Sequence, residues 1–165
     1  DDLTKISNRR GYMALAQHSL NLCTRQKITA SLAFVDLNNF KPINENNGQA
    51  EGDRALIAFT EQMKYSFRET ELLARQGGEE FVILFSNSSS NASRDAMKRF
   101  TRSLEKFNQK ANRGYDITFS YGLVEFDPDK HDSVEALLTE GDSLMYECKK
   151  QSKTSECGRM SAASR

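Results

Sequence analysis

The stretch RQGGEEFVILF, residues 75–85, joins two glycines and two glutamates to a run of five apolar residues. A glycine pair between apolar segments is typical of the tight turn of a β-hairpin. We therefore predict strands over residues 72–76 and 81–85 that pair antiparallel through this turn. The hairpin excludes a purely parallel sheet and places both glutamates where a buried strand begins.

The rest of the chain supplies helices and further strands around this hairpin. Apolar residues recur at helical spacing in four segments and follow a strand pattern in two more. The expected helices lie within residues 12–23, 56–67, 96–107 and 134–148, and the expected strands within 28–36 and 117–123. The polar segment between residues 38 and 53 predicts a loop with a short helix. The order indicates an α/β (α+β) fold with one mixed sheet covered by helices.

The composition restricts the class of protein. The 165 residues suit one domain of ordinary size, and no run of about 18 apolar residues is present to span a membrane. Basic and acidic residues both number 23, so the net charge is zero, which argues against a nucleic-acid partner. Three cysteines without a C-x-x-C pair predict neither a zinc site nor a disulfide framework and suit a reducing cytoplasm.

Three carboxylates are expected to converge at the hairpin. Asp36 follows a buried strand, while Glu79 and Glu80 follow the glycine turn. Because adjacent residues on a strand point to opposite faces, Asp36 can share a face with only one glutamate. We expect that one to be Glu79. Clustered carboxylates repel one another, and a divalent cation between them, magnesium or manganese, relieves the repulsion.

Cationic and backbone groups nearby suit a phosphate ligand. The NNFK loop after Asp36 can offer N–H groups and Lys41, and the last helix can add Lys149, Lys150 and Lys153. Each feature also has an ordinary explanation: the glycines as a hairpin turn, the glutamates as solvated charges, and the lysines as a response to the helix dipole. Their combination favours a metal-dependent phosphate site over these separate explanations.

The motifs resemble the diguanylate cyclase family, whose catalytic domain is named GGDEF after its hairpin. GGEEF at residues 77–81 is an accepted variant, and DDLTKISNRR resembles the family's opening segment. FVDLNNFKPINENNGQAEGD, TFSYG and DSLMYECK are similar to three further family motifs in the expected order. The resemblance implies a cyclase domain over residues 1–153 and a polar C-terminal tail without regular structure over residues 154–165.

The resemblance also implies a fold and an activity. The fold is a central five-stranded mixed sheet, related to polymerase palms and nucleotidyl cyclases, and the fifth strand is expected within residues 87–90, around Met160, or in a very short segment. The activity is condensation of two GTP molecules into cyclic di-GMP and two pyrophosphates by two-metal phosphoryl transfer. Each domain holds one GTP, so a homodimer is required. The alternative is a catalytically weak domain that binds GTP or cyclic di-GMP as a regulator.

Site roles follow from the aligned motifs. The implied metal ligands are Asp36, the Leu37 carbonyl and Glu79, with Glu80 also needed for catalysis. The implied substrate-binding residues are Asn44 and Asp53 for guanine, and Phe40, Lys41, Lys149 and Lys153 for the triphosphate. A product-inhibition site is implied at Arg68 and Glu71. For Arg75, a part in product binding and a salt bridge to a nearby carboxylate remain equal alternatives.

The sequence departs from the family pattern in several places. Asn38 replaces an aspartate, Gln49 replaces a histidine, and Glu71 replaces the aspartate of the product site. These changes leave the expected metal ligands and guanine contacts in place, so activity, although reduced, remains the expectation. We expect an upstream sensor domain in a longer bacterial chain. The domain is expected in the cytoplasm, either free or as the cytoplasmic part of a membrane-tethered protein.

Overall fold

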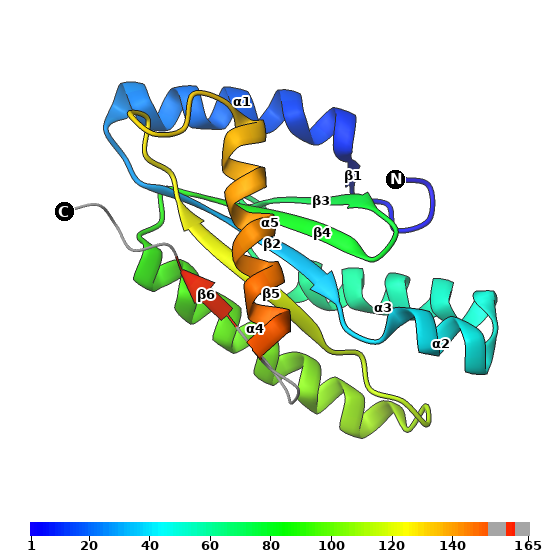
Figure 1. Cartoon of the computed structure of the whole chain (residues 1–165). Helices are drawn as coiled ribbons and strands as arrows, with labels where there is room; N and C mark the ends of the chain where they lie inside the picture. Colours follow the sequence, from blue (N-terminus) through cyan, green and yellow to red (C-terminus); the bar gives the residue numbers. More distant parts are fainter. Residues whose placement is uncertain (152–157, 161–165) are drawn as a thin grey trace.

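The computed structural model describes residues 1–151 and 158–160. A mixed sheet forms the centre, with strands in the order β1-β3-β4-β2-β5-β6 (Figure 1). The strands are β1 (Ser7–Asn8), β2 (Ala30–Leu37), β3 (Leu72–Gly77), β4 (Glu80–Ser86), β5 (Phe119–Glu125) and β6 (Gly158–Met160). The helices are α1 (Arg9–Gln26), α2 (Phe40–Asn47), α3 (Gln49–Ser66), α4 (Ser90–Ala111) and α5 (Val134–Gln151).

The expected five-stranded mixed sheet is confirmed as β3, β4, β2, β5 and β6. The fifth strand lies around Met160, one of the three expected places, and pairs parallel with β5. The two-residue strand β1 adds a sixth strand at the other edge, parallel to β3. The remaining neighbours pair antiparallel, including the predicted hairpin of β3 and β4. Such short edge strands carry too few residues to show a period in the sequence.

Helices cover both faces of the sheet. Helices α1 and α5 lie on one face, while α3 and α4 lie on the other (Figure 1). All eight residues of β2 are buried, because the strand is central and both of its faces are covered. This double cover explains why the sequence of β2 is apolar almost throughout instead of alternating. In the described part of the chain, none of the helices is both long and apolar enough to cross a bilayer.

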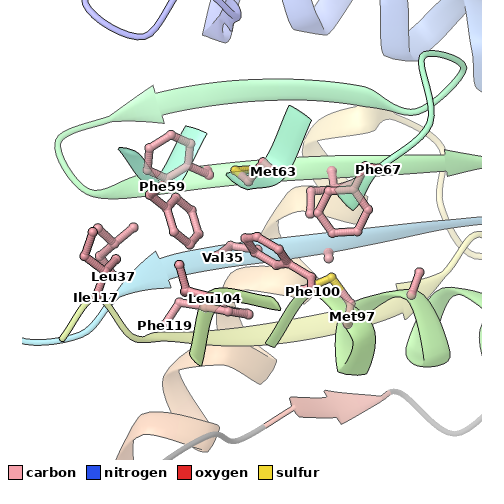
Figure 2. Packing of buried hydrophobic residues seen from close by; sticks show 14 of the residues in the cluster. Val35, Leu37, Phe59, Met63, Phe67, Met97, Phe100, Leu104, Ile117 and Phe119 are labelled. Carbon is pink, nitrogen blue, oxygen red and sulfur yellow. The ribbon is translucent and has the colours of Figure 1, made fainter. Parts of the chain in front are cut away.

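Aromatic rings fill the core between the sheet and the α3/α4 layer (Figure 2). Phe59 of α3 lies at the centre, with its ring centroid 5.1 Å from that of Phe81, 5.4 Å from Phe100 and 5.6 Å from Phe119. The rings are tilted relative to one another, as aromatic pairs prefer. Phe81 is the first residue after the two hairpin glutamates, so this packing fixes the start of β4 and the turn before it.

Candidate active site

The C-terminal end of β2 and the β3–β4 turn bring carboxylates together. In the antiparallel pairing of β2 with β4, Asp36 lies directly opposite Glu80. Opposite residues project to the same face of a sheet with Cβ atoms about 5 Å apart. Glu80, rather than the expected Glu79, is thus the direct neighbour of Asp36. The unbroken register of β2 with β4, from Ala30 opposite Ser86 onward, produces this pairing, and Glu79 lies in the turn before β4.

The carboxylates of this cluster disturb one another's ionisation. Burial raises the pKa of Asp36, the charges of Glu79 and Asp142 raise it further, and Lys149 opposes the shift. Burial likewise raises the pKa of Glu80, with the charges of Asp36, Asp142 and Glu79 adding to the effect. The cluster therefore carries more negative charge than its surroundings stabilise. A cation placed among these groups would relieve that repulsion.

Lys149, on the helix α5 that covers this face of the sheet, brings a positive charge into the cluster. Its ammonium group on α5 donates to the Oδ1 atom of Asp36. Close packing of α5 on β5 makes this reach possible, because a Cβ at Gly122 would lie 2.2 Å from the Gly141 carbonyl oxygen and 2.6 Å from the Met145 nitrogen. Glycine at position 122 is therefore a condition for the placement of Lys149.

The donor set fits a magnesium or manganese ion. The Leu37 N–H donates to the Glu79 carbonyl at 3.1 Å, and the N–H and C=O of one strand residue point to the same side. The Leu37 carbonyl thus faces the hairpin, beside the carboxylates of Asp36 and Glu79. All are oxygen donors of the kind that hard divalent cations prefer. Within residues 1–151 and 158–160, no three His, Cys, Asp or Glu side chains form a metal-binding group, and the implied set needs only two carboxylates and a carbonyl.

Asn38, which replaces an aspartate of the family pattern, has a structural partner. The Ser120 hydroxyl donates to its Oδ1 atom at 2.8 Å, and its own N–H donates to the Thr118 carbonyl at 2.8 Å. These bonds tie the loop after β2 to strand β5 and to Thr118, the residue before it. Asn38 thus holds the loop that follows Asp36.

The beginning of α2 offers an anion site next to Asp36. Asn39 adopts a left-handed conformation with φ of 56°, and its side chain makes no capping hydrogen bond. The first-turn N–H groups of Phe40 and Lys41 have no partner within the helix and point toward its N-terminal end. The Lys41 side chain is 83% exposed and lies 3.7 Å from Glu45, close enough to exchange this weak pair for a phosphate.

Asn44 and Asp53, the expected guanine contacts, lie on α2 and on the first turns of α3. The Asn44 Oδ1 atom is buried and has no hydrogen-bond partner in the described structure. Gly52 makes room for it, since a Cβ at Gly52 would lie only 1.8 Å from that atom. A buried acceptor without a partner is costly, so a ligand that donates a hydrogen bond to this oxygen would stabilise the site.

A hydrogen bond that the sequence did not reveal supports the start of α3. The Tyr115 hydroxyl donates to the Oε1 atom of Glu51 at 2.8 Å, which lowers the pKa of Glu51. Burial and this bond raise the pKa of Tyr115 to about 12. Asn108 holds the same loop through two bonds to the backbone of Ile117, at 2.9 and 3.0 Å. The connection from α4 to β5 thus braces the start of α3.

Comparison with known proteins identifies the family. The profile described as "Diguanylate cyclase, GGDEF domain" matches residues 1–155. The chain belongs to the GGDEF-domain family of diguanylate cyclases. A relative in Escherichia coli named "Probable diguanylate cyclase DgcC" is 27% identical over 150 residues, covering 91% of this chain and 40% of the relative. "Diguanylate cyclase TpbB" of Pseudomonas aeruginosa is 28% identical over 158 residues, covering 94% and 36%. The chain therefore spans less than half the length of these curated relatives.

Solved GGDEF domains share the fold. The isolated GGDEF domain of Pseudomonas aeruginosa TpbB superposes with a TM-score of 0.85 at 26% identity, over 98% of this chain and 94% of the other. The GGDEF domain of DgcB from Caulobacter crescentus, solved in complex with c-di-GMP, has a TM-score of 0.85 at 20% identity and covers 96% and 94%. At that identity the second likeness shows the fold alone.

A polar pocket of this GGDEF domain, separate from the carboxylate cluster, contains the expected product-site residues Arg68 and Glu71, between the end of α3 and the start of α4. The Arg68 N–H donates to the Glu71 carboxylate at 2.8 Å. Arg99 of α4 also lines this pocket, although no spacing along the chain links it to the other two residues. Its place in the pocket comes from packing alone.

Arg75 lies apart from this pocket. Its guanidinium donates to the Gly78 carbonyl at 2.9 Å and pairs with the Asp1 carboxylate at 3.3 Å. Of the two alternatives for Arg75, the structure therefore contains the salt bridge, which ties the hairpin turn to the N-terminal segment. Lys153, the remaining expected phosphate contact, lies outside the described residues, as does the expected tail apart from residues 158–160 in β6.

Proposed function

We propose that this GGDEF domain is a diguanylate cyclase that condenses two GTP molecules into cyclic di-GMP and two pyrophosphates. The observation that carries the proposal is the grouping of Asp36, Glu79 and Glu80 beside the ammonium group of Lys149. A phosphoryl-transfer site needs carboxylates for metal ions and cations for phosphates at the same place. The names of the curated relatives support the same activity.

The metal ions belong at the carboxylates. Asp36, Glu79 and the Leu37 carbonyl would hold magnesium or manganese, with Glu80 adjacent. When bound, such ions lower the pKa of the attacking 3′-hydroxyl and neutralise charge on the transferring α-phosphate. Lys149 is held by Asp36 in the structure and is free to turn toward a triphosphate when the carboxylate has another partner.

The residues of α2 and α3 would bind the nucleotide. The first-turn N–H groups of α2 and the side chains of Lys41, Lys149 and Lys153 bind the triphosphate. The Asn44 amide donates to guanine O6, and the Asp53 carboxylate accepts from N1–H and N2–H. Adenine has an acceptor at N1 and would leave Asp53 unpaired, which gives strong discrimination against ATP.

Two domains must face each other for the reaction, because each site holds a single GTP and the hydroxyl of one attacks the other. We propose a homodimer as the active form. In keeping with the greater length of the relatives, we further propose that an upstream sensor domain controls this dimerisation in the bacterial cytoplasm, in a free or membrane-tethered chain.

Incubation with GTP and magnesium, followed by chromatography, tests the proposal. A domain fused to a dimerising coiled coil should form cyclic di-GMP, and Glu79→Gln in the same fusion should form none while keeping the fold. Absence of product from the unmodified fusion contradicts the cyclase assignment.

The alternative is a catalytically weak domain that binds GTP or cyclic di-GMP as a regulator. It draws on the pocket of Arg68, Glu71 and Arg99 and on the replacement of an aspartate by Asn38. Calorimetry with cyclic di-GMP distinguishes the two functions: binding that is lost in Arg68→Ala, without any product from GTP, supports the regulator.

A further inference from the structure

A basic groove lies on the outer side of the α3/α4 layer, away from the carboxylate cluster. It encloses about 560 Å³ between the C-terminal parts of the two helices. Four cations line it, together with two aromatic rings: Arg99, Arg102, Lys106, Lys110, Tyr65 and Phe107. No aspartate or glutamate is among its lining residues.

The charge of the groove is unbalanced. The whole chain has a net charge of zero, yet four positive groups meet here. Within the described residues, none of the four forms an ion pair with a carboxylate. Cations this close together raise the local potential and attract an anionic partner.

The cations form a row. Arg99, Arg102, Lys106 and Lys110 are separated by three, four and four residues, so they share one face of α4. The row is about 16 Å long, at 1.5 Å per helical residue. Tyr65 of α3 borders the groove with 84% of its surface exposed. Arginine and tyrosine are among the residues most enriched at protein interfaces.

The groove lacks the backbone features of a compact phosphate site. Such sites use free N–H groups at helix N-termini or glycine loops. Here the lining residues lie between positions 62 and 65 and between 99 and 110, in the C-terminal halves of α3 and α4, where backbone N–H groups are bonded within the helix. A row of side-chain cations without backbone donors fits carboxylates that are themselves spaced one per helical turn.

We propose that the groove between α3 and α4 docks an acidic helical segment of a protein partner, whose carboxylates pair with the row on α4 while an apolar side chain packs on Tyr65. The spacing supports this match, because a helix with Glu or Asp on one face repeats its charges with the same rise as α4. This docking surface does not depend on the proposed cyclase activity.

Peptide binding tests the proposal without GTP. The probe is a labelled synthetic helix of about 16 residues, long enough to cover the row, with glutamates at every third or fourth position on one face beside a leucine. A peptide of the same composition with glutamates distributed around the helix is the comparison. Fluorescence anisotropy should show that the peptide with glutamates on one face, the one-faced peptide, binds more tightly than the comparison peptide. This binding should weaken as the salt concentration rises from about 50 to about 200 mM.

Paired variants locate the binding. Arg102→Gln with Lys106→Gln removes two charges from the row but leaves Arg99, which also lines the product pocket. Arg25→Gln with Lys98→Gln removes two exposed charges outside the groove. The first pair should weaken peptide binding about three- to tenfold, and the second should change it less than about twofold. All four positions are exposed, so both proteins should keep their thermal midpoints.

Three outcomes would overturn the proposal. These are no binding of the one-faced peptide, equal weakening by both pairs of substitutions, and tighter binding of a single-stranded oligonucleotide or phosphatidylserine vesicles than of the peptide. The third outcome would assign the groove to a nucleic acid or a lipid surface instead.

Discussion

Gly52→Ala should separate nucleotide binding from stability. A Cβ at this position would lie 1.8 Å from the Asn44 Oδ1 atom and 2.8 Å from its Cγ. Ordinary contact begins at about 3.5 Å, so the Asn44 amide must retreat by about 1.7 Å. The amide is the end of a flexible side chain and can rotate away at small cost. The fold should therefore survive while the expected guanine contact is lost.

Gly52→Ala should change the free energy of unfolding and the GTP affinity in opposite directions. Gly52 lies within α3, and alanine in a helix interior is more favourable than glycine by up to about 1 kcal/mol. The free energy of unfolding should thus stay the same or rise. Loss of one hydrogen bond to guanine costs about 0.5–1.5 kcal/mol, so GTP should bind roughly two- to tenfold more weakly.

Calorimetry with GTP and urea denaturation measure both quantities on the same protein. Gly11→Ala is the matched control, because its Cβ would meet the Asn8 Oδ1 atom at an ordinary 3.5 Å and α1 is far from α2 in the fold (Figure 1). It should leave GTP affinity unchanged. Unchanged GTP affinity in Gly52→Ala would refute the role of Asn44 in guanine recognition.

Three further substitutions probe the cluster and the fold. Glu79→Gln should abolish cyclic di-GMP formation by a dimerised domain while the circular dichroism spectrum stays the same; retained activity would exclude Glu79 as a metal ligand. Burial raises the pKa of Glu80, so the ionised carboxylate opposes folding, and the contribution of Glu80 to the stability of the free domain should fall as pH rises from about 4 to 7. Glu80→Gln should reduce that fall in urea titrations, and an unchanged pH dependence would contradict this origin. His131 is buried, accepts a hydrogen bond from the Asp127 N–H at 3.0 Å and contacts the Glu140 carboxylate at 2.9 Å. Because His131→Ala removes both interactions, it should lower the free energy of unfolding by about 1–3 kcal/mol. A thermal midpoint equal to that of the unchanged protein would refute this.

Much of the fold could be predicted from the sequence, because strong local signals agree with the tertiary packing. The glycine pair marks the hairpin, and most apolar positions of the four long helices lie on the faces that they bury, although Leu15 of α1 is exposed. The short strands at the edges had no such signal. Strand β1 has two residues and β6 has three, so each depends on a neighbour for its conformation. The helix α2, expected only as a short helix within a loop, extends from Phe40 to Asn47.

The sequence by itself determined the hairpin and the family and predicted the chemical type of the site, because these reside in residue identity and spacing along the chain. Only the tertiary structure decided that Glu80, and not Glu79, lies opposite Asp36, since the register between β2 and β4 joins segments far apart in the chain. It also decided that Lys149 reaches Asp36 and that Arg99 joins the pocket of Arg68. Those contacts link residues far apart in the chain, and their distances depend on how closely the helices pack on the sheet.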